Sequence, residues 1–119
     1  MLDQSAVIST VRQYADDVRQ ALAPAAIVLY GSYASGTARE GSDIDVAVIF
    51  DGYQGDWLSD SALLWKLACK RSLDIEPVLL DRAHDRSGFA AEVMQTGHLI
   101  YQSSKGTEDG AKTANPVSY

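Results

Sequence analysis

The sequence predicts an α/β domain in which helices and short strands alternate along the chain. An amphipathic helical repeat near the N-terminus is followed by two apolar runs of strand length, and helix and strand patterns then alternate as far as residue 102. A chain of 119 residues has the size of one domain with a single modest core. Residues 103–119 lack apolar periodicity, so we expect a domain over residues 1–102 followed by a flexible tail.

The first predicted element is an amphipathic helix that begins near Asp3 or Ser5. We expect it to end before Pro24, which cannot continue a helix. Its apolar residues recur at helical spacing and are Ile8, Val11, Ala15, Val18 and Leu22.

Two short buried strands are predicted next, separated by a turn that contains glycine and serine. The first strand is the apolar run 25–30, which leads directly into Gly31 and Ser32. The second is the run VAVIF, which Asp43 and Asp45 introduce. Residues 51–60 hold two glycines and three aspartates and are expected to form a connecting loop.

The second half of the domain repeats the alternation. A helix is predicted from about Trp57 to Arg71, with Cys69 near its end as a small buried or half-buried side chain. A third strand over residues 73–80 contains Pro77, which cannot donate a ladder hydrogen bond, so the strand lies at an edge or is bulged there.

Three short segments complete the predicted domain. They are a loop over residues 81–87, a helix over residues 88–96 and a strand over residues 98–102. Gly97 follows the helix directly and is expected to cap it.

Asp43 and Asp45 form the first candidate site. Alternate strand residues share a face, so their Cα atoms would lie roughly 6.6 Å apart on one side of the strand. Like charges on one face repel each other, and folding alone does not account for them. A pair of divalent cations about 3.5–4 Å apart would make this acidic pair a site. Oxygen ligands suit Mg²⁺, with Mn²⁺ as an alternative.

Gly31 and Ser32 form the second half of this candidate site. Glycine lets a backbone approach a phosphate closely, and the serine hydroxyl can donate a hydrogen bond. A helix that began there would add free N–H groups. Taken separately, the Gly-Ser pair is an ordinary turn and the aspartates a solvated strand entrance. Their occurrence together, each beside an apolar strand, favours a nucleotide and metal site.

The pattern G-S-x10-D-x-D resembles the signature of the nucleotidyltransferase superfamily that includes DNA polymerase beta. It is most similar to the minimal nucleotidyltransferases of bacteria, over residues 25–101. The resemblance implies a mixed β-sheet flanked by helices. It also implies transfer of a nucleoside monophosphate from a nucleoside triphosphate to a hydroxyl group. Asp43 and Asp45 would hold two Mg²⁺ ions, and Gly31 with Ser32 would cradle the phosphates.

The resemblance also implies a third carboxylate on a later strand, which completes the metal site and assists deprotonation of the attacking group. Asp74 and Glu76 are spaced to share a strand face. Glu76 is the best positional match, although relatives usually carry aspartate there, and Asp74 remains the alternative. A solvated edge strand would also tolerate both acids.

Three further positions are compared with the family. Arg39 falls where relatives often carry a basic residue, and it is a candidate phosphate ligand. Ser42 is a candidate nucleotide-binding residue, and a turn or cap role is its alternative. Ser35 stands where many relatives have arginine, which weakens the expected grip on the triphosphate.

The charge balance and the resemblance together suggest a partner. A formal net charge of -6 argues against direct binding of nucleic acid. Minimal nucleotidyltransferases pair with a helical HEPN-class toxin, and as antitoxins they adenylylate it with AMP from ATP. Two alternatives stay open. One is a nucleotide-binding module that neutralises or regulates a partner by contact. The other is an antibiotic nucleotidyltransferase, which usually adds an acceptor domain.

Composition also predicts where the protein acts. No run reaches the roughly 18–20 apolar residues of a membrane span, and the N-terminus shows no signal-peptide pattern. The single cysteine, Cys69, excludes an internal disulfide and a cysteine-based zinc site. We therefore expect a cytoplasmic protein that does not enter a membrane.

Overall fold

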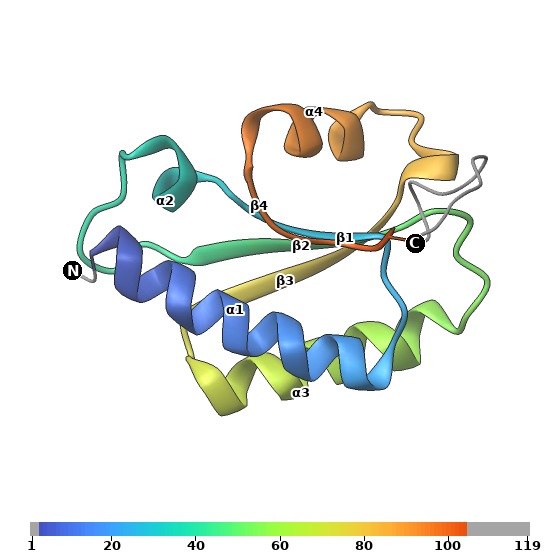
Figure 1. Ribbon diagram of the computed structural model, residues 1–119, viewed down its shortest axis with the longest axis horizontal. Helices are drawn as coiled ribbons and strands as arrows, with labels where there is room; N and C mark the ends of the chain where they lie inside the picture. The colour runs from blue at the N-terminus through green and yellow to red at the C-terminus, as the bar shows by residue number, and fades with distance from the viewer. Residues whose placement is uncertain (1–2, 105–119) are drawn as a thin grey trace.

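A computed structural model describes residues 3–104, and within them the predicted alternation of helices and strands is present (Figure 1). The elements in chain order are α1 (Gln4–Ala21), β1 (Ala26–Tyr30), α2 (Ser32–Ser35), β2 (Ile44–Phe50), α3 (Trp57–Arg71), β3 (Ile75–Asp81), the 3-10 helix η1 (Arg82–His84), α4 (Phe89–Thr96) and β4 (His98–Gln102). Apart from Ser103 and Ser104, the predicted tail lies outside the described residues.

The four strands form one mixed sheet in the order β3-β2-β1-β4. β1 is antiparallel to β2 and to β4, whereas β2 and β3 are parallel. The mixed sheet flanked by helices that the resemblance implied is therefore confirmed. β3 is an edge strand, as Pro77 predicted, and it pairs with β2 without a break in register.

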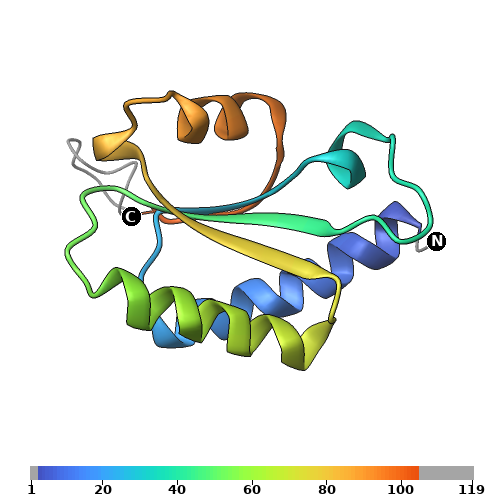
Figure 2. The same ribbon diagram turned by 180° about the vertical axis from the view of Figure 1, so that it is seen from behind.

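Helices cover both faces of the sheet. α1 and α3 lie side by side on one face, and α4 lies on the other (Figures 1 and 2). The Asp3 carboxylate caps α1 by accepting a hydrogen bond from the Ala6 N–H at 2.8 Å, which confirms the predicted start of this helix. Between α1 and α3, the buried Tyr14 hydroxyl donates to the Leu64 carbonyl at 3.0 Å.

Two cores result from this layering. The larger one joins α1, α3 and one face of the sheet, and the smaller one lies under α4. The fully buried side chains of the larger core include Val7, Val11, Tyr14, Val18, Ile27, Leu29, Ile44, Val46 and Leu64. No helix within residues 3–104 has both the length and the apolar character that crossing a bilayer requires.

The structure corrects several sequence-based predictions. The third strand begins at Ile75 rather than at residue 73, and Asp74 lies in the turn before it. A 3-10 helix, η1, occupies part of the segment predicted as a loop over residues 81–87. Cys69 is exposed, so its predicted burial is wrong. Leu64 and Ala68 form the inward face of α3. Cys69 directly follows Ala68 and therefore points about 100° away from this face around the helix axis.

Gly97 ends α4 as predicted, but its role is not that of a left-handed cap. Its φ is -84°, and its N–H donates to the Val93 carbonyl at 2.8 Å. A side chain here would collide with the Val93 and Leu29 carbonyl oxygens, at 2.7 and 2.9 Å from a Cβ, and with the Val28 side chain. Glycine is needed because the chain passes so closely over β1.

Candidate active site

Three strands bring Tyr30, Asp45 and Glu76 into one row across the sheet. Tyr30 of β1 pairs with Asp45 of β2, and Asp45 pairs in turn with Glu76 of β3. Residues directly opposite each other on neighbouring strands point to the same side, so the three side chains share a face. On this face the smaller core, which includes Val28 and Ala47, packs under α4.

The row lies where the helical cover of this face ends. Asp45 is half-buried and Glu76 is exposed, in contrast to the buried residues of the smaller core beside them. α2 and α4 flank the region, and both lie next to the end of β1 in Figure 1. The acidic side chains therefore stand at an open edge of the sheet that solvent and a ligand can reach.

Asp43 joins the row from the residues just before β2. It was predicted to share the strand with Asp45, but β2 begins at Ile44. The pKa of Glu76 is raised, first because its carboxyl group shares a hydrogen bond with that of Asp43, and then by burial and by the charges of Asp43 and Asp45. The pKa of Asp45 is raised by burial and by the negative charge of Asp43. The three carboxyl groups therefore interact as one acidic cluster.

A divalent cation fits this set of oxygen donors. Within residues 3–104, no three acidic, histidine or cysteine side chains already stand in the arrangement of a metal cage. Mg²⁺ does not need one, because it commonly takes one or two carboxylates and completes its shell with phosphate oxygens and water. The acidic cluster thus fits a cation that binds together with a nucleotide.

Gly31 places the start of α2 directly against Asp45. The segment predicted as a turn contains this short helix, with Gly31 at φ 76° and ψ -151° as the N-cap residue. A Cβ at Gly31 would lie 3.1 Å from the Asp45 Cγ and would overlap its carboxylate. Only glycine allows both this backbone conformation and this close approach. The Gln4 side-chain amide donates to the Tyr33 carbonyl at 2.8 Å, which ties α2 to α1.

The structure brings Glu76, rather than Asp74, to the other acids. Asp74 lies in the turn before β3, and its carbonyl accepts a hydrogen bond from the Ile44 N–H at 2.8 Å. Asp74 thus stabilises the start of β2 through its backbone. This placement supports the choice of Glu76 as the third carboxylate.

Arg39 and Ser42 lie in a tight turn before β2. The Arg39 N–H donates to the Ser42 hydroxyl at 2.8 Å, and the Ser42 N–H donates to the Arg39 carbonyl at 2.9 Å. Ser42 therefore stabilises the turn through its hydroxyl group. A turn or cap role was the alternative to nucleotide binding in the prediction for this residue. The Arg39 side chain is exposed, and within residues 3–104 no ion pair links it to the acidic cluster.

Sequence reasoning missed Tyr30 and Phe89. Tyr30 is half-buried, and its pKa is raised by burial and by the charges of Asp45 and Glu76. The Phe89 ring meets it edge-on, with centroids 5.6 Å apart and planes at 82°. Both rings line a hollow of about 330 Å³ that begins at Gly31 and lies between α2 and α4. The only signal in the sequence was a tyrosine directly before the Gly-Ser pair.

Comparison with known families agrees with this geometry. Residues 13–106 match the family described as polymerase beta, nucleotidyltransferase. This match covers most of the chain and includes every residue of the acidic cluster. The chain belongs to the polymerase beta nucleotidyltransferase family.

Two solved structures share the fold of this chain. One is a Sulfolobus solfataricus protein with a proposed nucleotidyltransferase assignment, with a TM-score of 0.62 and 18% identity over 86% of each chain. The other is described as a toxin-antitoxin with AMP-PNP, with a TM-score of 0.58 and 24% identity over 80% of this chain and 76% of that one. No curated protein matches the sequence.

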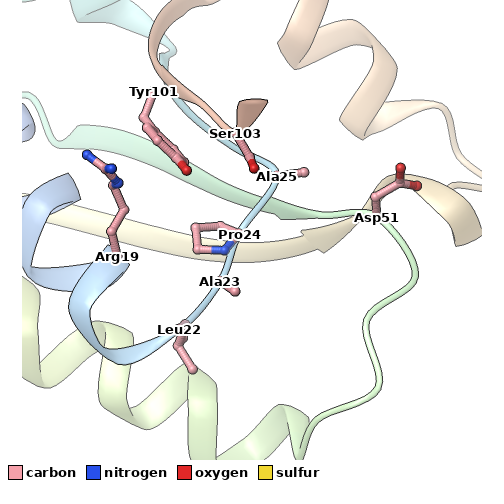
Figure 3. Close-up of a pocket in the computed structure, with 8 residues that line it drawn as sticks. All are labelled: Arg19, Leu22, Ala23, Pro24, Ala25, Asp51, Tyr101 and Ser103. Atoms are coloured by element: carbon pink, nitrogen blue, oxygen red, sulfur yellow. The ribbon is translucent and has the colours of Figure 1, made fainter. Parts of the chain in front are cut away.

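The protein has another hollow, of about 510 Å³, at the opposite end of the sheet (Figure 3). Its lining residues are Arg19, Leu22, Ala23, Pro24, Ala25, Asp51, Tyr101 and Ser103. Within it, the Arg19 guanidinium carbon lies 4.2 Å from the centre of the Tyr101 ring, a cation–π contact that ties α1 to β4. None of the predicted site residues lies here.

Proposed function

We propose that this nucleotidyltransferase transfers AMP from ATP to a hydroxyl group on a partner HEPN-type toxin, and that it is the antitoxin of the pair. The observation that carries the proposal is the acidic cluster of Asp43, Asp45 and Glu76 directly beside the Gly31 turn. Family membership supports transfer of a nucleotide. The choice of AMP and of a toxin partner rests on the sequence resemblance and on the relative described as a toxin-antitoxin with AMP-PNP.

In the proposed reaction, the oxygen of the acceptor hydroxyl attacks the α-phosphorus of ATP. The bond from this phosphorus to the oxygen that bridges to the β-phosphate breaks, and pyrophosphate leaves with the electron pair. The hydroxyl proton passes to a carboxylate, for which Glu76 is the candidate. Gly31 and Ser32 cradle the phosphates at the start of α2.

Asp43 and Asp45 would hold Mg²⁺ or Mn²⁺, with Glu76 completing one of two metal sites. Such ions supply charge neutralisation on the phosphates and lower the pKa of an attacking hydroxyl. A cation there would also relieve the repulsion within the acidic cluster, which the raised pKa values of Asp45 and Glu76 reflect.

Charge supports a basic protein as the acceptor. The net charge of -6 would steer a basic, RNA-cutting partner towards this chain and would repel free nucleic acid. A tyrosine hydroxyl is a suitable acceptor group because its ordinary pKa is near 10. A nearby cation can lower this pKa enough for the hydroxyl group to ionise at neutral pH. The proposal places this reaction in the cytoplasm.

Intact-mass measurement tests the proposal. The purified chain, the protein encoded by the neighbouring gene, Mg²⁺ and ATP are mixed, and the mass of that second protein is expected to rise by one or more AMP units. Removal of divalent cations should abolish the gain. Asp43→Asn combined with Asp45→Asn should also abolish it, with a melting temperature near or above that of the wild type because like-charge repulsion is relieved.

Two outcomes would count against parts of the proposal. Full transfer by the double variant would refute the site assignment. Metal-dependent ATP binding without any AMP transfer would favour the nucleotide-binding module instead. One observation supports that second candidate. Ser35 stands where many relatives have an arginine that would bind the triphosphate. Its hydroxyl group instead bonds to the Thr37 hydroxyl at 2.9 Å and to the Ser32 carbonyl at 3.3 Å.

A further inference from the structure

The hollow between α2 and α4 adjoins the acidic cluster. It has a volume of about 330 Å³, and Gly31 forms part of its wall. Gly31 also lies against the Asp45 carboxylate, so the hollow and the acidic cluster meet at this residue. A volume of this size is at the lower end of the range for small-molecule sites. The hollow is therefore large enough to hold one part of a nucleotide while the acidic cluster holds another.

The lining of the hollow does not suit phosphate. Among the described residues, none that lines it is a lysine, an arginine or a histidine, and Glu92 adds a negative charge. A phosphate group placed there would be repelled by this carboxylate, with no cationic side chain in the lining to compensate. The base is the uncharged part of a nucleotide, and it is the part that fits. The other lining residues are Tyr30, Gly31, Ala34, Ser35, Phe89, Val93, Thr96 and Gly97.

Phe89 offers aromatic surface to a base. Its side chain is 37% exposed, although its ring meets that of Tyr30 edge-on. An edge-on contact covers less of the two ring faces than stacking does. Every nucleobase has a π-face that stacks on such a ring. The hollow thus combines an accessible aromatic ring with a position next to the proposed phosphate site.

Glu92 supplies a hydrogen-bond acceptor that the chain itself does not use. Within residues 3–104, no hydrogen bond or ion pair engages its carboxylate. The hydroxyl groups of Ser35 and Thr96 are already engaged, with the Thr37 hydroxyl and the Glu92 carbonyl, each at 2.9 Å. An ionised carboxylate only accepts hydrogen bonds, so its ligand must present an N–H or O–H group. The exocyclic amino group of adenine is such a donor.

We propose that this hollow binds the adenine base of the nucleotide, with the base stacked on Phe89 and its exocyclic amino group donating a hydrogen bond to Glu92. The inference rests on the proposed function, from which it takes the nucleotide. It adds the residues that select the base. Neither Phe89 nor Glu92 would touch the reacting phosphorus, so both would act on binding and specificity rather than on the chemical step.

Calorimetric titration of the full chain with nucleotide and Mg²⁺, without an acceptor protein, tests the role of Glu92. The two ligands are ATP and purine riboside triphosphate, which differs from ATP only in lacking the amino group. Wild-type protein should bind ATP about tenfold more tightly. Glu92→Met removes the acceptor and should bring the two dissociation constants together. Glu92→Gln retains an accepting oxygen and should preserve most of the difference.

The comparison of these two variants separates base recognition from a role in the helix alone. Glu92 lies in the first turn of α4, where a negative charge stabilises the helix. Glu92→Gln and Glu92→Met both remove that charge, so their melting temperatures should fall by similar amounts. Equal discrimination between the two nucleotides in the wild type and in both variants would overturn the proposal.

Filling the hollow provides a second measurement. Thr96→Trp should weaken ATP binding about tenfold or more, because the indole would occupy the place of the base. Binding of inorganic triphosphate with Mg²⁺ should not change, because this ligand has no base. Gln95→Trp is the matched control: Gln95 is the preceding residue of α4 and is also exposed, but it does not line the hollow. Equal ATP binding by the two tryptophan variants would contradict the proposal.

The same titrations distinguish failure of this inference from failure of the proposed function. If the wild type binds inorganic triphosphate and ATP with Mg²⁺, but ATP binding is indifferent to Glu92→Met and Thr96→Trp, only the inference fails. If the wild type binds neither ligand, both fail. If Glu92→Met leaves ATP binding unchanged but lowers AMP transfer to the partner, the hollow receives the acceptor side chain, and the assignment to the base is overturned.

Discussion

At the scale of single residues, Asp45 has the most constrained position in the candidate site. Its neighbours in the sheet are Tyr30 and Glu76, and the Gly31 backbone lies against its carboxylate. The orientation of Asp45 is therefore set by contacts on three sides. Substitutions at these neighbours should affect catalysis more than they affect the fold.

Gly31→Ala tests the close approach to Asp45. The added Cβ would displace the Asp45 carboxylate and would force a conformation that is nearly unique to glycine. We expect a loss of unfolding free energy of about 1–3 kcal/mol and a loss of most transfer activity. Gly36→Ala is the control, because Gly36 also has a positive φ, at the other end of α2, with no atom within 4 Å of a Cβ. If both variants retained similar activity, the contact with Asp45 would have no catalytic role.

Glu76→Gln tests the third carboxylate. The substitution preserves size and removes the charge, and because Glu76 is exposed the melting temperature should change little. The transfer rate should fall by about 10²-fold or more, as is typical when a general base is lost. Asp74→Asn is the matched control and should stay within about threefold of the wild type. A larger loss in Asp74→Asn than in Glu76→Gln would transfer the role to Asp74.

At the scale of elements, the ends of β2 and β3 are joined by the Asp81 carboxylate. It accepts hydrogen bonds from the Gly52 and Tyr53 N–H groups at 2.8 and 3.0 Å, and from the Ala83 N–H at 3.0 Å. His84 Nδ1 lies 3.0 Å from it. The loop after β2 and the helix η1 after β3 are thus tied to one side chain. Asp81 was predicted to lie in a loop, but it is the last residue of β3.

Asp81 should make stability depend on pH in the acid range. Burial raises its pKa, but the bonds from His84 and from the Gly52, Ala83 and Tyr53 N–H groups outweigh burial and lower the pKa from 3.8 to about 2. Because the folded pKa lies below the unfolded one, this contribution is complete above about pH 4. It is lost as the pH falls through about 2.

Asp81→Asn should therefore lower the unfolding free energy at pH 7 by about 2 kcal/mol. The difference in unfolding free energy between Asp81→Asn and the wild type should narrow as denaturation is measured at lower pH, and it should vanish below about pH 2. Asp51→Asn is the control and should have a small effect, because the Asp51 side chain is 56% exposed and lies 3.5 Å from its partner Arg82. A difference between Asp81→Asn and wild type that is independent of pH would contradict this account.

At the scale of the whole molecule, the net charge of -6 should exclude nucleic acid from the surface. We expect no change in the fluorescence anisotropy of labelled single-stranded RNA or DNA at 0.1 M salt. A salt-dependent dissociation constant tighter than about 10 µM would contradict this expectation and would reopen the question of a nucleic-acid acceptor. A basic protein of similar size is the positive control for the assay.

The sequence by itself determined the order of the four strands and the three longer helices, and the local chemistry of the site. The bounds of α3 and the edge position of β3 follow from neighbouring residues: a hydrophobic period, and a proline that lacks an N–H. The acidic pair Asp43 and Asp45 could also be recognised from neighbouring residues. Two like charges beside an apolar strand repel each other, so their presence pointed to a site in that segment.

Tertiary structure alone decided which distant residues meet. Glu76 reaches Asp45 because β2 and β3 run parallel in one register, and that pairing depends on contacts between segments about 30 residues apart. Tyr30 and Phe89 meet because α4 packs over β1, and Cys69 is exposed because Leu64 and Ala68 occupy the inward positions of α3. Local patterns show that a side chain is apolar or acidic, but only long-range packing determines which face of an element becomes buried and which remains free to bind.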